Sequence, residues 1–345
     1  MTMKQKKTYL EIIRIIAIFL VIYVHTGTDG AEHYQIAGNA FSYCLSLVMY
    51  CLAQISVPLF FMVSGAVLLH KKETLKDVLI HRASRILGLI LVFGFVQYVY
   101  FYFLNPEIGF SLSVYFKLVY STTVITQFWY LYTYFAFMLI LPFVRMLAVS
   151  MKKEHFLYLF GLHFLLNGLL PIVEYIWGNS RIVLSVPLLE GALFYPLMGY
   201  FLEHQSDEFF CRKKFLVFTN FFGIMAVITN TVVAFMAHRQ RGGAETLEGM
   251  TAAIALVLFL DLRALARHVK VFYRLQRIIC FLGSGVFGVY LLEPPLRDSF
   301  RFIYVALKPY ISWFPACALW IFSAMFCGIL MFHIFKKIPV LKKLF

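Results

Sequence analysis

Long apolar windows alternate with short polar segments along the whole chain. Ten windows have about the length of a membrane-spanning helix: 9–26, 43–69, 86–104, 128–149, 156–176, 182–202, 215–237, 249–266, 278–300 and 312–334. A helix needs about 20 residues to cross the hydrocarbon core of a bilayer, so the pattern predicts an all-α, polytopic membrane helix bundle with about ten transmembrane helices. The second window is long, and Pro58 is expected to kink it within the bilayer.

The polar segments between the windows carry lysine and arginine unevenly. If the N-terminus lies inside, the inner segments hold 23 of the 31 basic residues and the outer segments hold 7. Inner loops of membrane proteins are enriched in Lys and Arg, so the distribution predicts that both termini are cytoplasmic. The chain is expected to reside in the plasma (inner) membrane.

Composition agrees with this class and narrows it. Hydrophobic residues make up 61% of the 345 positions and charged residues only 14%, which leaves too little polar surface for a soluble domain. The net charge of +14 lies in short clusters between apolar runs, and this argues against nucleic acid as a partner. No small-residue cleavage site follows the first window, and the inter-helix loops are short. We therefore expect a retained first helix and a single membrane domain over 1–345, without a fused soluble domain.

Cysteine usage does not indicate a disulfide framework or a metal centre. Five of the six cysteines lie inside or at the edge of apolar runs, and none forms a C-x-x-C or a Cys/His cluster. Buried reduced thiols and no bound metal are the expectation.

The first window carries ionisable residues in an otherwise apolar run. It reads "EIIRIIAIFLVIYVH" over 11–25, with Glu11, Arg14 and His25. Eleven residues at about 100° each bring Arg14 and His25 to the same helix face, roughly 16 Å apart along the axis. Glu11 precedes Arg14 by three residues and is expected to pair with it. Snorkelling of Arg14 with an interfacial histidine would explain these residues too, but intramembrane ionisable groups indicate function by default.

Six segments, in order, resemble one known family. Arg14 and His25 fit the R-x10-H pattern of the first helix of the acyltransferase-3 superfamily of integral membrane O-acyltransferases. "SVPLFFMVSGAVLL" (56–69), "RASR" (82–85), "QFWYLYTYFAFMLILP" (127–142), "FYPLMGYFLE" (194–203) and "FLGSGVFGVYLLEPPL" (281–296) resemble further family segments. The resemblance covers essentially the whole chain. One departure stands out, because relatives read Y-L-x-H-x-P where this chain has Glu293 after Tyr290-Leu291-Leu292.

The resemblance implies an enzyme that passes an acyl group, usually acetyl, from cytoplasmic acyl-CoA to a hydroxyl at the outer face. The acceptor would be a cell-surface glycan or a lipid-linked sugar. Read against that reaction, a neutral imidazole near pH 6.5 suits a general base, and His25 is either that base or a nucleophile that carries the acyl group. Glu293 stands where many relatives have histidine, so either its carboxylate fills the role of that histidine or the role is lost; on the first alternative it is a further catalytic candidate. Arg14 would bind a phosphate, stabilise the thioester or maintain the geometry of the passage.

The remaining site predictions concern the two substrates. Arg82 and Arg85 share a helix face, and their guanidinium groups suit the phosphates of coenzyme A, although basic residues also anchor inner helix ends. Ser64 and Gly65 would let the acyl arm approach the backbone, or would simply allow close helix packing. Trp129 and Tyr130 would stack on a sugar, or belong to an aromatic belt.

Two other classes compete with an acyltransferase. Intramembrane Arg, His and Glu side chains also suit a proton-coupled transporter of a small solute or of an acylated product, but no inverted repeat is visible. A non-catalytic scaffold leaves the aligned charges of the first helix unexplained. The sequence does not indicate an oligomeric state.

Overall fold

The computed structural model describes residues 3–105, 107, 109–177, 184, 186–206, 210, 212–268, 274–342 and 344, and this part of the chain is all-helical. Two π-helical stretches, Val78–Ala83 and Leu165–Leu169, extend neighbouring α-helices. The α-helices are α1 (Met3–Val24), α2 (Ala40–Ala53), α3 (Ser56–Leu68), α4 (Leu75–Asp77), α5 (Ser84–Leu104), α6 (Leu112–Ser121), α7 (Trp129–Ser150), α8 (Lys153–Phe164), α9 (Leu170–Trp177), α10 (Gly191–His204), α12 (Lys213–Arg241), α13 (Glu248–His268), α15 (Gln276–Leu291), α16 (Glu293–Leu307), α17 (Trp313–Phe335) and α18 (Pro339–Lys342).

The all-α class is confirmed, but the count of ten spans is not. Seven helices of the described chain are long and apolar enough to cross a membrane, or eight if the bent pair α15 and α16 is one span. Helix α1 has 22 residues but carries several charges, and α10 has only 14 residues. The amphipathic helix α6, between the third and fourth predicted windows, was not predicted at all.

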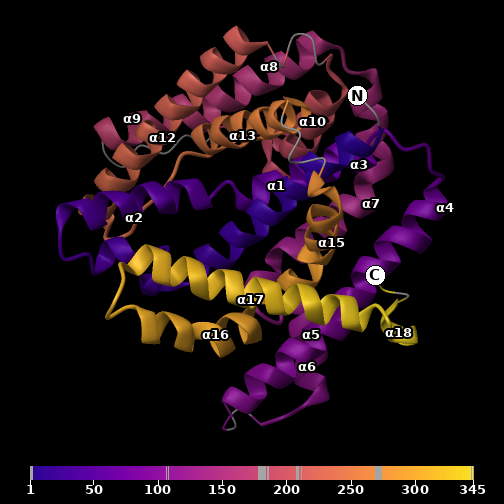
Figure 1. Ribbon diagram of the computed structural model, residues 1–345. Helices are drawn as coiled ribbons and strands as arrows, with labels where there is room; N and C mark the ends of the chain where they lie inside the picture. The colour runs from indigo at the N-terminus through magenta and orange to yellow at the C-terminus, as the bar shows by residue number, and fades with distance from the viewer. Residues whose placement is uncertain are drawn as a thin grey trace.

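Helix α1 runs through the middle of the bundle, with α3, α13, α15 and α17 packed around it (Figure 1). Tyr9, Ile13, Ala17 and Ile18 on this helix are completely buried. A helix that is enclosed on several sides needs apolar side chains all round, which is what the sequence supplies apart from its few ionisable residues.

Helices α3 and α10 cross with their backbones in close contact. A methyl group added to Gly65 would lie 1.9 Å from the backbone oxygen of Pro196, and one added to Gly199 would lie 1.9 Å from the backbone oxygen of Met62. The two glycines therefore allow the two backbones to touch. Small residues serve this purpose in membranes, where apolar burial alone does not draw helices together.

The second predicted span is confirmed as one candidate span, Ala40–Leu68, but it is interrupted within its length, and the interruption is not at Pro58. Helix α2 ends at Ala53 and α3 begins at Ser56, with Gln54 and Ile55 between them. Pro58 lies in the first turn of α3, where the absence of a backbone N–H costs no helical hydrogen bond. The proline therefore follows the break and belongs to a helix start.

The predicted span 278–300, by contrast, is wrong as a single straight helix. Helices α15 and α16 are bent by 101° around Leu292. Gln97 of α5 is fully buried and donates to the backbone oxygen of Leu291 at 2.8 Å, and Trp320 of α17 donates to the backbone oxygen of Arg297 at 2.8 Å. Both bonds stabilise the bend, after which α16 lies beside α17 (Figure 1).

The charges at the end of the eighth window have structural partners. Arg263 of α13 donates to the backbone oxygens of Leu202 and Gln205 at the C-terminal end of α10, the second at 2.8 Å. Asp261 accepts from Asn220 Nδ2 at 2.8 Å. Arg263 thereby satisfies carbonyl groups that a helix end leaves without intrahelical donors.

The crossing of α3 and α10 generates a stability prediction. Gly199→Ala should destabilise the protein by about 1–3 kcal/mol or more, because the new methyl group must push a backbone oxygen away. The thermal unfolding midpoint of the purified protein in detergent measures the effect.

Gly161→Ala on α8 is the matched control. A methyl group there meets nothing within 4 Å, so stability should be unchanged or rise by up to about 1 kcal/mol through the better helix propensity of alanine. Equal midpoints for Gly199→Ala and the wild type would contradict the close crossing.

Candidate functional site

Two cavities lie next to each other within the bundle. The histidine cavity, of about 540 Å³, is lined by His25 together with residues from the starts of α3, α7, α10 and α13. The arginine cavity, of about 390 Å³, is lined by Arg14, Arg82 and Arg85 together with residues of α7 and α15. Phe60 and Tyr130 belong to the linings of both cavities. The predicted site residues thus fall into two adjoining groups.

His25 follows the last residue of α1 and has an acidic neighbour. Its Nδ1 lies 3.4 Å from Oε2 of Glu293, and the two side chains are 22% and 1% exposed. The other carboxylate oxygen of Glu293 accepts from Arg297 Nη1 at 3.0 Å. A buried carboxylate needs such a partner to remain charged, so Arg297 compensates Glu293 and leaves Oε2 facing the imidazole.

The bend after α15 is what brings Glu293 to His25. Glu293 is the first residue of α16, and Pro294 and Pro295 follow it in the first turn, where proline is tolerated. If 278–300 were one straight helix, Glu293 would lie further along the axis of α15. The turn of 101° instead directs the start of α16 toward the end of α1.

The arginine cavity contains guanidinium groups in different electrostatic states. Arg14 donates to Glu11 Oε1 at 2.7 Å, which confirms the predicted pair within α1. Arg82 makes a two-point contact with Glu73, through Nε at 2.7 Å and through Nη2. Arg85 is exposed, and no described residue makes an ion pair or hydrogen bond with its side chain. Arg85 is therefore the guanidinium most available to an anionic ligand.

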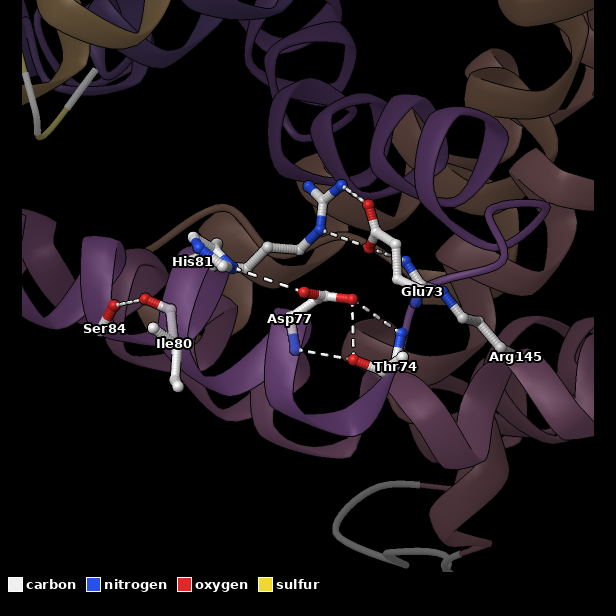
Figure 2. A network of polar contacts seen from close by, with 8 residues as sticks. Glu73, Thr74, Asp77, Ile80, His81, Ser84 and Arg145 are labelled. Atoms are coloured by element: carbon white, nitrogen blue, oxygen red, sulfur yellow. Dashed lines mark hydrogen bonds and ion pairs between the residues drawn. The ribbon is translucent and has the colours of Figure 1, made fainter.

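Glu73, which lies between two predicted spans, connects two arginines. Besides Arg82 it binds Arg145, whose Nη2 donates to Oε2 at 2.7 Å, and Figure 2 shows Glu73 between Arg145 and the Thr74–Asp77 cap of α4. The hydrogen bonds from Arg82, more than that from Arg145, lower the pKa of Glu73 to about 2. Arg145 also donates to the backbone oxygen of Leu68 at 3.0 Å, so this network ties the end of α3 to α7.

The other predicted residues occupy different places. Trp129 is 47% exposed and lines the histidine cavity, and Tyr130 is buried in the wall between the cavities. Ser64 lines the arginine cavity, with its hydroxyl bonded to the backbone oxygen of Phe60 at 2.8 Å. Gly65 lines neither cavity, because it packs against α10; its geometry favours the packing alternative over cofactor binding.

Three residues of the histidine cavity escaped the sequence reasoning. Glu190 and Glu248 line it, as does Tyr195 on α10. Both glutamates stand in a Leu-Glu-Gly tripeptide directly before or at the start of an apolar helix. An acidic residue repeated at the start of two apolar helices could have marked both glutamates as candidate site residues. Nothing in the sequence shows that both helix starts face one cavity.

The two cavities offer different chemistry. No group of three His, Cys, Asp or Glu side chains that could hold a metal occurs among the residues that the structure describes. One cavity presents guanidinium groups to an anion, and the other presents an imidazole with a carboxylate behind it.

Comparison with known proteins gives one match. The acyltransferase-3 family model, which describes an acyltransferase domain, matches residues 7–338. No curated protein and no solved structure matches the chain.

The Glu73 network predicts a pH-dependent stability. The pKa of Glu73 is about 2 in the folded chain against an ordinary 4.5, so its contribution is complete above pH 4.5 and is lost as the pH falls toward 2. Glu73→Gln should lower stability near pH 7 by about 2 kcal/mol, because hydrogen bonds to charged groups contribute about 1.5–3 kcal/mol each. The difference in stability between Glu73→Gln and the wild type should disappear as the pH falls from 4.5 to 2. Unfolding midpoints of both proteins across this range measure it.

Glu154→Gln is a control of the same chemistry. Glu154 is exposed at the start of α8, and no described residue is bonded to its carboxylate. It should change stability little at any of these pH values. A constant gap between Glu73→Gln and the wild type from pH 7 to pH 3 would contradict the charged network.

Proposed function

The chain belongs to the acyltransferase-3 family and is a membrane acyltransferase, and from this premise we propose that it is an acyl-CoA-dependent O-acyltransferase. The donor would be acetyl-CoA, and the acceptor a hydroxyl of a cell-surface glycan or a lipid-linked sugar. One observation supports this most directly: the cavity with the arginines and the cavity with the histidine share Phe60 and Tyr130 as walls. A donor in one cavity and an acceptor in the other would meet there.

In this proposal the arginine cavity holds the phosphates of coenzyme A. Guanidinium groups bind phosphate through two parallel hydrogen bonds, and Arg85 has no described partner that would have to be displaced. Arg82 is already engaged by Glu73, so its contribution would be a positive potential on the cavity wall. The pantetheine arm would then run past Ser64, Phe60 and Tyr130 toward the histidine.

The reaction assigns a role to each group of the histidine cavity. Oε2 of Glu293 lies 3.4 Å from Nδ1 of His25, and the structure has no hydrogen bond between these two atoms. In the reaction Glu293 would attract a proton on Nδ1, so that Nε2 would be the basic nitrogen and would take the proton of the acceptor hydroxyl. The hydroxyl oxygen attacks the thioester carbonyl, the C–S bond breaks, and the CoA thiolate leaves and is protonated. Glu293 would orient the imidazole and stabilise its charged form, as a carboxylate in place of the family's histidine. Transfer through an acyl-histidine at His25 is the alternative route.

Membrane topology follows from the basic residues. The arginine cavity would open to the cytoplasm, where acyl-CoA is found, and the histidine cavity to the outer face of the plasma (inner) membrane, with both termini cytoplasmic. Arg14, between the two ends of α1, would stabilise the thioester or the diphosphate.

A proton-coupled transporter is the competing function, and one assay separates the two. The purified protein should release CoA from acetyl-CoA, faster with a glycan acceptor than without. Saturable solute uptake into proteoliposomes without any release of CoA would instead identify a transporter.

The first prediction from this function concerns donor binding. Arg85→Ala should weaken acetyl-CoA binding by roughly tenfold, the loss of one charge-assisted hydrogen bond of about 1.5 kcal/mol. Lys76→Ala is the control, because Lys76 is an exposed basic residue of the same helical segment that lies outside the cavity lining. Equilibrium binding of acetyl-CoA and of dephospho-CoA to both variants measures it.

Dephospho-CoA, which lacks the 3′-phosphate, shows which phosphate group Arg85 binds. A loss with acetyl-CoA alone assigns Arg85 to the 3′-phosphate, and an equal loss with both ligands assigns it to the diphosphate. Unchanged affinity for both ligands would refute binding of the donor at Arg85.

The second prediction concerns His25. His25→Ala should lower acyl transfer by about 10²–10⁴-fold, the usual contribution of a positioned general base, while acetyl-CoA binding persists because the arginine cavity is intact. Single-turnover transfer and equilibrium donor binding are measured on the same preparation. Normal transfer in this variant would exclude both roles of His25.

Radiolabelled acetyl-CoA without acceptor separates the two roles. A labelled wild-type protein whose label is absent from His25→Ala identifies an acyl carrier. An unlabelled wild-type protein that transfers normally identifies a general base.

A further inference from the structure

The histidine cavity carries two acidic side chains that the proposed reaction does not use. Glu190 and Glu248 both line it and are exposed, and no described residue forms an ion pair or hydrogen bond with either carboxylate. Among the described lining residues none is lysine or arginine. Two carboxylates therefore face the cavity without a compensating cation from the described lining.

The two carboxylates come from separate parts of the chain. Glu190 directly precedes α10, and Glu248 is the first residue of α13. A methyl group added to Gly191 would lie 3.5 Å from Oε1 of Glu248, so this carboxylate lies against the start of α10. The fold thus brings both acids to the same side of the cavity.

A second, independent feature of this side points to a ligand. Tyr195 is only 3% exposed, and its hydroxyl is buried without any hydrogen-bond partner, although the residue lines the cavity. Its ring lies 3.1 Å from the same position on Gly191. A buried hydroxyl without a partner is costly, and a polar ligand in the cavity would supply the missing bond.

The two cavities therefore differ in sign. Arg14, Arg82 and Arg85 line one of them; Arg14 and Arg82 are paired with Glu11 and Glu73, so Arg85 supplies its uncompensated positive charge. Glu190 and Glu248 line the other. A cleft lined by one sign of charge concentrates ligands of the opposite sign and repels ligands of its own. The field of the acidic cavity would repel the diphosphate of coenzyme A and an anionic acceptor alike.

We propose that Glu190, Glu248 and Tyr195 form the acceptor-binding side of the histidine cavity and select an uncharged or cationic polyhydroxyl acceptor. An acceptor with a carboxylate or phosphate beside the acylated hydroxyl is rejected. Carboxylate oxygens accept hydrogen bonds from neighbouring hydroxyls, and the exposed Trp129 offers an apolar face on the same cavity. This inference deepens the proposed function and rests on it, because only an acyltransferase has an acceptor. The charge preference of the cavity, however, is measurable without turnover.

The test places a cysteine in each cavity. Ala192→Cys reports on the acidic cavity and Ser284→Cys on the basic one, since each residue lines its cavity. The full-length protein is treated at pH 8 with a cationic trimethylammonium-ethyl or an anionic sulfonatoethyl methanethiosulfonate. Peptide mass spectrometry gives the rate at each cysteine. Dividing the two rates removes the effect of thiol ionisation, which is the same for both reagents.

At Ala192→Cys the cationic reagent should react about 10-fold faster or more, relative to a free thiol in solution, and at Ser284→Cys the anionic reagent should be favoured. Adding Glu190→Gln and Glu248→Gln should bring the Ala192→Cys ratio to that of the free thiol. Cys317 is fully buried and should stay unmodified throughout, which reports that the fold is intact.

Equal ratios in the two cavities would overturn the inference, as would an Ala192→Cys ratio that the double glutamine variant leaves unchanged. The comparison of the two cysteine variants needs no glutamate substitution. It therefore tests the opposite charge preference of the cavities even if the Glu190→Gln and Glu248→Gln protein unfolds.

Acyl transfer from acetyl-CoA to methyl glucoside and to methyl glucuronide separates this inference from the proposed function. Preference for the glucoside supports both, and equal or faster transfer to the glucuronide overturns the inference. If neither sugar is acylated while the thiol ratios are as expected, the sugar acceptor of the proposed function fails and the charge selection stands.

Discussion

Helix α1 occupies the centre of the bundle, and the cost of its ionisable groups there constrains the surrounding structure. A charged side chain away from water is stable only with a partner. Arg14 has Glu11 within the same helix, and His25 has Glu293, which Arg297 in turn compensates. The second arrangement requires the chain to turn sharply at Leu292, so the site histidine and the bend after α15 depend on one another.

Close backbone contact provides the second constraint. Helices in a membrane gain little from apolar burial against one another, and small residues that admit close approach replace that driving force. Gly65 and Gly199 bring α3 against α10, and the linings of both cavities draw on residues of α3. The wall formed by Phe60 and Tyr130 therefore rests on a crossing that a single methyl group would disturb.

The charged side chains that line the two cavities are of opposite sign, so the two cavities favour different ligands. In the proposed function, an anionic donor would be stabilised beside the arginines and repelled beside the glutamates, so its phosphates would remain on one side while its arm extends past Tyr130. Glu73 holds Arg82 at the edge of the basic cavity and leaves Arg85 available. The two cavities are thus separate, yet they adjoin at Phe60 and Tyr130.

The sequence by itself determined the helical class, the Glu11–Arg14 pair and the positions of the chemistry-bearing residues, because hydrophobic length and helical periodicity are local properties. Family membership was also visible, since six ordered segments carry it and the family model spans residues 7–338. Local pattern did not reveal the break at Gln54 and Ile55 or the bend at Leu292, because an apolar run looks the same straight or bent and the bonds from Gln97 and Trp320 come from distant helices. It also did not separate Gly65, which packs, from Ser64, which lines a cavity. Only the tertiary structure brought His25 to Glu293 and Glu190 to Glu248, because such pairs arise from contacts between segments far apart in the chain.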